Sequence, residues 1–316
     1  MGIGYHKTFE EQLNLLIERG IQVGNREKAL KRLKNIGYYK IKEFAEPFFK
    51  TYKSGDETIK KYDKIYLEAV VNRFYQDKNL RNCLLHSLEK VELSFKTYFA
   101  YLLGEKDPYN YLNFNFWCNK EEYCKHYIEL KNKEFKRHLK KLLNQNKTPT
   151  LYEFYRENKN QEFPPIWIAI EVMSFGDIIN LFELMSNKNR KIIARNFNCT
   201  DGELESWLNN LKFIRNKCAH NCNIIDLKIH TKPRIKNEWK ELLSTDGNTK
   251  IASVIIILNY LVKQINEEYE FGLVHKSLKN LIRKKIVIAN KLGFKTKESI
   301  NFLFEKKEDI IEIKKG

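Results

Sequence analysis

Apolar side chains recur every three or four residues along most of this chain, the spacing that places them on one face of an α-helix. The longest such pattern, from Tyr62 to Leu103, predicts one long helix that is broken at most once. Shorter patterns predict further helices over residues 166–185, 201–220, 235–243, 250–269 and 276–292. A content of only 13 Gly and 6 Pro also favours long helices over a many-turned β-protein. The sequence therefore predicts an all-α fold.

The first part of the chain predicts a small helical unit of its own. One helix is expected to end at Gly20, and a second to begin at the capping residue Asn25 and end at Gly37. Aromatic residues follow, and short helices around a hairpin or turn could resemble a winged helix. The expected organisation is an N-terminal helical unit over residues 1–55, a helical domain over 56–294 with a basic insertion helix at about 120–147, and a basic C-terminal tail over 295–316.

Charged residues interrupt two of the apolar faces. Asp77 and Arg81 lie one helical turn apart on the face of the long helix, and a charge there must be paired or must line a cavity. A structural Asp77–Arg81 pair explains the pattern, and the alternative is that Arg81 reaches an active site. Glu171 lies on the apolar face of the helix expected at 166–185 and needs a cationic partner. Arg215 is the first candidate and Arg81 the second.

The charge balance indicates a polyanionic partner. The chain has 57 Lys+Arg against 40 Asp+Glu, a formal net charge of +17, and nucleic acid is the commonest polyanion. The helix expected over Lys125–Lys147 is the most basic segment, so we expect it to contact phosphates, although a charge run can also be a solvated face. The residues expected to bind RNA are Lys125, Lys131, Lys133, Lys136, Arg137, Lys140, Lys141 and Lys217.

The sequence Arg215-Asn216-x3-His220, at the end of the helix expected at 201–220, carries the clearest chemistry. Arginine is a permanent cation that fits phosphate oxygens, and histidine moves protons near neutral pH. Together they could cleave RNA without a metal, with His220 handling the 2′-hydroxyl or leaving-group proton and Arg215 stabilising charge on the phosphorus. On a regular helix His220 lies about 140° around from Arg215. Either the helix ends or distorts near Asn216, or the site gathers groups from two copies of the motif.

Two further patterns suggest other sites. Arg81-Asn82-x3-His86 repeats the spacing and could supply an internal second half-site, although coincidence is the simpler explanation. Cys218-x-His220-x-Cys222 suggests zinc, but a tetrahedral site needs four ligands and no second pair has suitable spacing. We therefore expect no metal site and no cofactor.

The length of the apolar segments and the residues of the N-terminus predict where the protein is located. The longest apolar stretch, Ile251 to Val262, is too short to span a bilayer, so no membrane partner is expected. The N-terminus has no basic segment followed by an apolar run, so no signal peptide is indicated. The chain is expected to be cytoplasmic.

Several motifs resemble one known family. These are Pro164-Pro165-Ile166-Trp167-x3-Glu171-x3-Phe175-Gly176 and Trp207-Leu208-x2-Leu211-x3-Arg215-Asn216-x-Cys218-Ala219-His220. Asp77-Lys78-x-Leu80-Arg81 and Glu89-x2-Glu92 belong to the same set. In these motifs, which follow one another in the expected order along nearly the whole chain, the protein resembles the Abi-like abortive-infection family of bacterial phage-defence proteins (the AbiD/AbiF group).

The resemblance implies a HEPN-type helical bundle and a metal-independent endoribonuclease that leaves 2′,3′-cyclic phosphate ends. It carries over Arg215, Asn216 and His220 as catalytic residues, in a site usually completed by pairing two HEPN domains, which here implies a homodimer. It also implies RNA as the substrate and, as in some members, a small structured RNA as a regulatory partner. The alternatives are a catalytically silent RNA-binding module and a nucleotide-modifying or metal enzyme. The lack of paired carboxylates at metal-binding spacing counts against the last.

Overall fold

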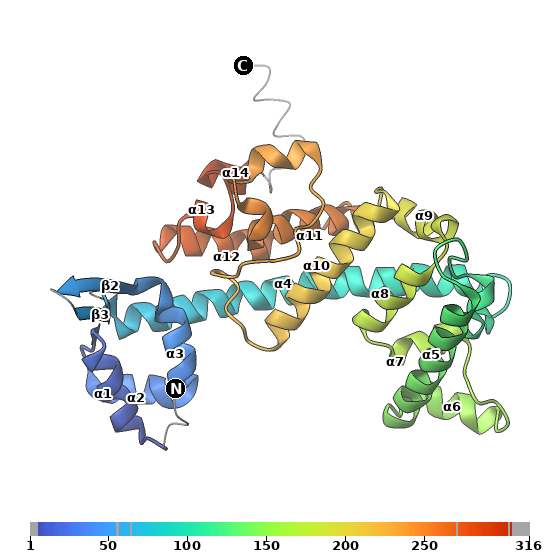
Figure 1. Cartoon of the computed structure of the whole chain (residues 1–316), viewed down its shortest axis with the longest axis horizontal. Helices are drawn as coiled ribbons and strands as arrows, with labels where there is room; N and C mark the ends of the chain where they lie inside the picture. Colours follow the sequence, from blue (N-terminus) through green and yellow to red (C-terminus); the bar gives the residue numbers. More distant parts are fainter. Residues whose placement is uncertain (1–5, 55–56, 64, 270, 303, 305–316) are drawn as a thin grey trace, which may run out of the picture.

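The computed structural model describes residues 6–54, 57–63, 65–269, 271–302 and 304 of the chain. One helix, α4 (Leu67–Gly104), runs along the length of the molecule, and the other elements are arranged along it (Figure 1). Its 38 residues form an unbroken helix, which at 1.5 Å per residue is about 57 Å long. The sequence-based prediction of a long helix is therefore confirmed, and the all-α fold with it.

The N-terminal unit lies at one end of α4. Its helices are α1 (Phe9–Glu18), α2 (Arg26–Ile36), α3 (Tyr38–Ala45) and the 3-10 turn η1 (Glu46–Phe48). Strands β2 (Phe49–Ser54) and β3 (Glu57–Tyr62) form an antiparallel hairpin, and β1 (Ile21–Gln22) pairs in parallel with β4 (Ile65–Tyr66). Gly20 follows α1 with φ +100°, and Asn25 accepts a hydrogen bond from the Lys28 amide, so both expected helix ends are confirmed. The hairpin continues past residue 55, where the sequence predicted this unit to end.

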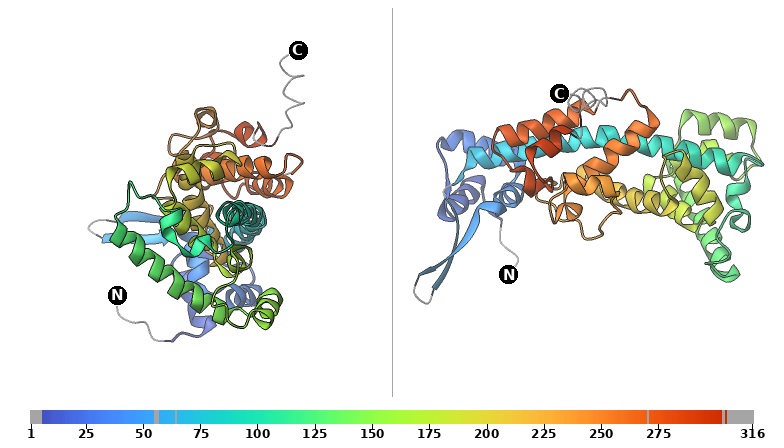
Figure 2. Two further views of the ribbon diagram at one scale, coloured as in Figure 1. Left: turned by 90° about the vertical axis from the view of Figure 1, so that its right-hand side faces the viewer. Right: turned by 90° about the horizontal axis from the view of Figure 1, so that it is seen from above.

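The opposite end of α4 carries the elements from residue 110 to residue 184 (Figures 1 and 2). They are η2 (Asn110–Leu112), η3 (Phe114–Phe116), α5 (Lys125–Gln145), α6 (Pro149–Glu157), α7 (Ile166–Val172) and α8 (Phe175–Leu184). The prediction of one helix over 166–185 is wrong. The side chain of Ser174 accepts a hydrogen bond from the Asp177 amide, and the Asp177 carboxylate accepts one from the Ser174 amide, so a new helix starts there.

The remaining elements follow in the chain. They are α9 (Asn187–Arg195), α10 (Asp201–Ala219), η4 (Asn237–Leu242), η5 (Gly247–Thr249), α11 (Ile251–Ile265), α12 (Gly272–Arg283), α13 (Ala289–Leu292) and α14 (Lys297–Phe302). Among them, α9, α10, α11 and α12 pack against α4. The helix expected at 276–292 is thus two helices, and the one expected at 235–243 is a 3-10 helix. Residues 305–316 of the expected basic tail lie outside the described residues.

The core is continuous along α4. Helix α11 is buried at nearly every position, and its apolar side chains fill the space between α4 and α10 with those of the neighbouring helices. Among the described residues, none of the helices is both long and apolar enough for a membrane span.

Candidate active site

The motif residues lie on the last turns of α10. Thr200 caps the start of this helix, and its apolar face, from Leu204 to Cys218, is buried. Arg215, Asn216 and His220 are all exposed. The helix remains regular to Ala219, and the His220 amide still donates to the Asn216 carbonyl at 3.0 Å. Of the two alternatives, the one in which the helix ends or distorts near Asn216 is therefore wrong, and the separation of about 140° between Arg215 and His220 stands.

Arg215 is oriented by a carboxylate from α4. Its Nε lies 3.9 Å from the Oε2 of Glu92, at the outer limit of an ion pair, and its side chain remains 44% exposed. Glu92 is also 3.5 Å from the Nζ of Lys96, whose ammonium donates to the Met173 carbonyl. Glu92 therefore holds the guanidinium loosely, which leaves it available to a phosphate.

The expected ion pair of Glu171 with Arg215 or Arg81 is wrong. Helix α7 turns Ile166, Ala169 and Ile170 inward, and Glu171 is left on its exposed side. Glu171 makes no ion pair with any described residue. The carboxylate beside Arg215 is that of Glu92 and not that of Glu171.

Asp77 and Arg81 form the buried pair that the sequence predicted. The Arg81 Nε donates to the Asp77 Oδ2 at 2.7 Å, and both side chains are almost completely buried. Arg81 also donates to the side-chain oxygen of Asn221 at 2.8 Å, while the Oδ1 of Asp77 accepts from the amides of Ile224 and Ile225 at 2.9 and 3.1 Å. The pair thus braces residues 221–226, hereafter the post-α10 loop, which begins directly after His220.

Burial disfavours the charged form of the acid in this pair. It raises the pKa of Asp77 to about 6, against the opposing effects of the hydrogen bonds from the Ile224 amide and from Arg81. These donors therefore stabilise the charge of ionised Asp77 in the core.

Arg73 is a third contact from α4 to the post-α10 loop, and sequence analysis did not find it. Its guanidinium pairs with Asp226 and donates to the Ile286 carbonyl, and its side chain is 5% exposed. Arg73, Asp77 and Arg81 are spaced by four residues, so one face of α4 holds the loop at three successive turns. The spacing was visible in the sequence, but nothing in it indicated the partner.

The two alternative motifs are not assembled into sites. Arg81 is committed to Asp77 and Asn221, whereas His86 is exposed. Burial raises the pKa of the Cys218 thiol to about 12, while His220 on the same short motif faces solvent. Within the described part of the chain, no group of three His, Cys, Asp or Glu side chains is placed to hold a metal ion.

A cavity of about 440 Å³ lies beside α10. It is lined by Gly202, Glu205, Ser206, Asn209, Asn210 and Phe213 of α10 and by Ile229, His230, Thr231 and Arg234. At 100° per residue, Asn209 and Phe213 fall within about 20° of His220 around the helix, so the cavity and His220 share one face. Amide groups and an aromatic ring are the partners that nucleobases use for hydrogen bonding and stacking.

Helix α5 presents cations at the far end of the molecule (Figure 1). Lys125, Lys131 and Lys140 have carboxylate partners in Glu129, Glu134 and Glu162. Four cations make no ion pair with a described residue: Lys133, Lys136, Arg137 and Lys141. Lys217, on α10, lies over the Phe213 ring at 5.3 Å from its centroid. Of the residues expected to bind RNA, those four are therefore the most available to phosphates.

Comparison with known families adds the deciding observation. Residues 31–226, more than half of the chain, match the model of a family described as Abi-like protein. The chain belongs to the Abi-like family. The matched range includes α4, α10 and the post-α10 loop of this Abi-like protein and leaves α11 to α14 outside. Membership indicates a role in abortive-infection phage defence. Neither the curated proteins nor the solved structures that were compared gave a match.

Proposed function

We propose that this Abi-like protein is a HEPN-type, metal-independent endoribonuclease that cleaves RNA to 2′,3′-cyclic phosphate ends during phage defence. The observation that carries the proposal is the exposure of Arg215, Asn216 and His220 together at the end of α10, beside a loop braced from the core. The net charge of +17 supports a polyanionic substrate. A cognate small structured RNA is the proposed regulator.

The proposed step needs one base and one cation. His220 takes the proton from a 2′-hydroxyl, the 2′-oxygen attacks the adjacent phosphorus, and the bond to the 5′-oxygen breaks, which leaves a cyclic phosphate. The leaving 5′-oxygen receives a proton from solvent or from a second histidine. Arg215 stabilises the charge that accumulates on the non-bridging oxygens, since its planar fork matches their geometry. Asn216, one turn before His220, is placed to hydrogen-bond the substrate beside it.

The test is to incubate RNA-free protein with single-stranded RNA in EDTA and to analyse the product ends. Cyclic 2′,3′-phosphate ends support the proposal, and activity that EDTA abolishes would contradict it. Binding without cleavage would instead support the silent RNA-binding module. An RNA that co-purifies must be removed first, because a bound regulator would mask activity.

The separation of Arg215 from His220 around α10 supports a homodimer as the active form. In a two-fold pair, the arginine of one copy can serve the phosphate beside the histidine of the other. We expect that mixing Arg215→Ala protein with His220→Ala protein recovers part of the cleavage activity. Each dimer that forms from one copy of each variant contains one intact composite site. The rate of the mixture is compared with that of each variant alone. A mixture as inactive as each variant alone would contradict the homodimer hypothesis. Light scattering that finds only monomer in the active protein would contradict it as well.

The cavity beside α10 is the proposed binding site for a base next to the cleaved phosphate. Phe213→Ala is expected to raise KM by about 5-fold to 150-fold and to flatten base preference, since base–aromatic stacking contributes about 1–3 kcal/mol. Cleavage of a randomised RNA pool followed by sequencing of the ends gives the preference. Phe213→Tyr, which keeps the ring, is the matched control. An unchanged preference in Phe213→Ala would place the base elsewhere.

Helix α5 is the proposed surface for the RNA backbone. Replacing Lys133, Lys136, Arg137 and Lys141 by Gln should make RNA binding less salt-dependent, because each phosphate contact contributes about 0.7 to the slope of log affinity against log salt on a single strand. Binding is measured over a range of salt concentrations with His220→Ala protein, so that the RNA is not cleaved. The matched control replaces Lys28, Lys31, Arg32 and Lys34, four exposed cations of α2. A salt dependence that changes only in the control would show that the RNA backbone contacts the N-terminal unit instead of α5.

A further inference from the structure

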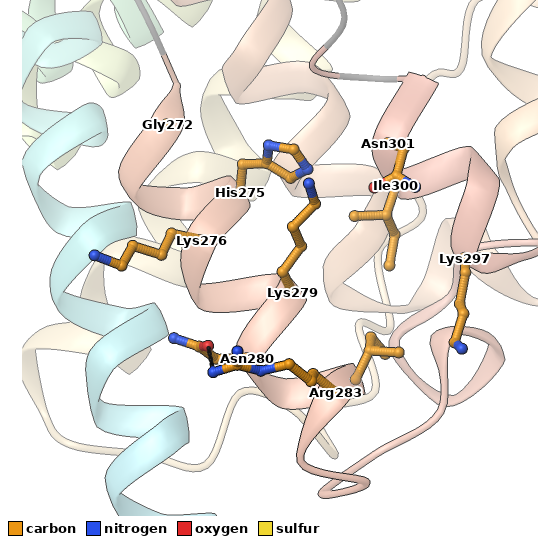
Figure 3. Close-up of a pocket in the computed structure, with 10 residues that line it drawn as sticks. Gly272, His275, Lys276, Lys279, Asn280, Arg283, Lys297, Ile300 and Asn301 are labelled. Atoms are coloured by element: carbon orange, nitrogen blue, oxygen red, sulfur yellow. Dashed lines mark hydrogen bonds between the residues drawn. The ribbon is translucent and has the colours of Figure 1, made fainter.

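A second cavity, of about 660 Å³, lies between α12 and α14 (Figure 3). It is lined by Gly272, His275, Lys276, Lys279, Asn280, Ile282, Arg283, Lys297, Ile300 and Asn301. Its volume falls in the range of sites for nucleotide-sized ligands. None of these residues belongs to α10, and all of them lie outside the range that matches the Abi-like family.

The charge of this cavity is one-sided. Its lining includes the cations Lys276, Lys279, Arg283 and Lys297 and no carboxylate. None of the four makes an ion pair with a described residue. Lys279 and Arg283 are one turn apart on α12, where like charges destabilise a helix slightly. An anion between them would remove that repulsion.

The cavity also holds uncharged hydrogen-bonding groups. The buried Nε2 of His275 has no hydrogen-bond partner in the described structure, and the His275 ring stacks on Phe304 with centroids 4.4 Å apart. Burial, and then the nearby Lys279, lower the pKa of His275, which favours the neutral imidazole. A neutral ring can donate from one nitrogen and accept at the other. The side chain of Asn301, on the opposite wall, hydrogen-bonds the His275 ring and opposes this lowering of the pKa.

The cavity combines charged and apolar side chains on both of its walls. Figure 3 shows Lys279 extending toward His275, with Ile300 and Lys297 across the cavity on α14. Arg283 lies at the other end of the cavity and donates to the side-chain oxygen of Asn280 at 3.2 Å. A ligand that fills this space therefore needs an anionic group and a flat, partly apolar group with polar edges.

We propose that the cavity between α12 and α14 binds a nucleoside phosphate, with the phosphate at the wall of α12 that carries Lys279 and Arg283 and the base against Ile300 of α14, within reach of His275 and Asn301. Cations that approach a phosphate in a concave site form charge-assisted hydrogen bonds. The site goes beyond the proposed ribonuclease activity and does not depend on it. Because its walls come from two helices, an occupant would also fasten α14 to α12.

Isothermal titration calorimetry of the full chain tests the proposal. The probes are the 5′-monophosphates of adenosine, guanosine, cytidine and uridine, with adenosine and inorganic phosphate as the separate halves of the ligand. We expect at least one monophosphate to bind at one site per chain, at least 10-fold more tightly than adenosine or inorganic phosphate. A further arm uses a short single-stranded RNA with His220→Ala protein, so that the probe stays intact. Binding of the RNA alone, with no monophosphate bound, would overturn the proposal in favour of an RNA surface.

Variants locate the bound probe. Lys279→Gln combined with Arg283→Gln should weaken monophosphate binding by about 10-fold to 100-fold, because two charge-assisted contacts are lost. The control, Lys284→Gln combined with Lys291→Gln, removes the same charge from exposed positions outside the cavity. Asn301→Ala should reduce the preference for the monophosphate over inorganic phosphate. Equal binding by the double variant and its control, or no binding of any monophosphate, would overturn the proposal.

Discussion

His220→Ala and Arg215→Ala are each expected to lower the rate of RNA cleavage by about 10²-fold to 10⁴-fold. His220 moves a proton and Arg215 stabilises charge, so the two side chains act on different atoms of one step and neither can replace the other. Both side chains are exposed, and their removal should leave the fold intact. Single-turnover cleavage assays and toxicity on induction in cells measure the effect.

Unfolding measurements on both variants provide the control for stability. Lys228→Ala, which removes an exposed cation just after the post-α10 loop, tests whether charge alone explains the loss. Cleavage by His220→Ala at a near-wild-type rate would show that the proposed mechanism is wrong, whatever the result for Arg215.

Asp77→Ala is expected to lower the free energy of unfolding by about 3–5 kcal/mol at neutral pH. The substitution leaves the buried Arg81 without its carboxylate, and it also removes the acceptor of the Ile224 and Ile225 amides. The post-α10 loop should loosen as a result, and cleavage should fall even at temperatures where the variant remains folded. Chemical denaturation and hydrogen exchange of the loop amides are the measurements.

Two comparisons separate the charge from the loop contacts. Asp77→Asn keeps one oxygen that can accept from the loop amides, but it then places an uncharged NH₂ group, a donor, before Arg81. Lys78→Ala changes an exposed neighbour on the same helix and should alter the stability by no more than about 0.5 kcal/mol. A loss for Asp77→Ala as small as that for Lys78→Ala would show that the pair does not brace the loop.

Local patterns explain what the sequence could predict. The continuous helix α4, the glycine after α1 and the Asn25 cap depend on spacing and on single residues, and all three are in the structure. The Asp77–Arg81 pair was predictable because both charges lie on one apolar face, one turn apart. The start of α8 was overlooked although Ser174 and Asp177 have the spacing of a capping box.

Contacts between distant segments explain what could not be predicted. Placing Glu171 inside required a single helix through α7 and α8, and the break at Ser174 removed the basis for that expectation. The partner of Arg215 is Glu92, on a helix more than 100 residues earlier, and no spacing along the chain encodes that approach. The cavities at α10 and α12 likewise depend on how separate helices meet.

The contacts of α4 also determine when this protein can become active during its synthesis. Asp77 accepts a hydrogen bond from the Ile224 amide, which is synthesised 147 residues later. Arg73 donates to the carbonyl of Ile286, which is synthesised 213 residues later. At 5–20 residues per second, a ribosome needs on the order of 10–40 s to add the latter stretch. Until residues 221–226 are added, the buried charges of α4 lack their partners and the end of α10 has no brace. A chain truncated within α11 has the residues of the brace but lacks part of the core between α4 and α10. It should therefore be inert, so that a message cut short during infection yields no active protein.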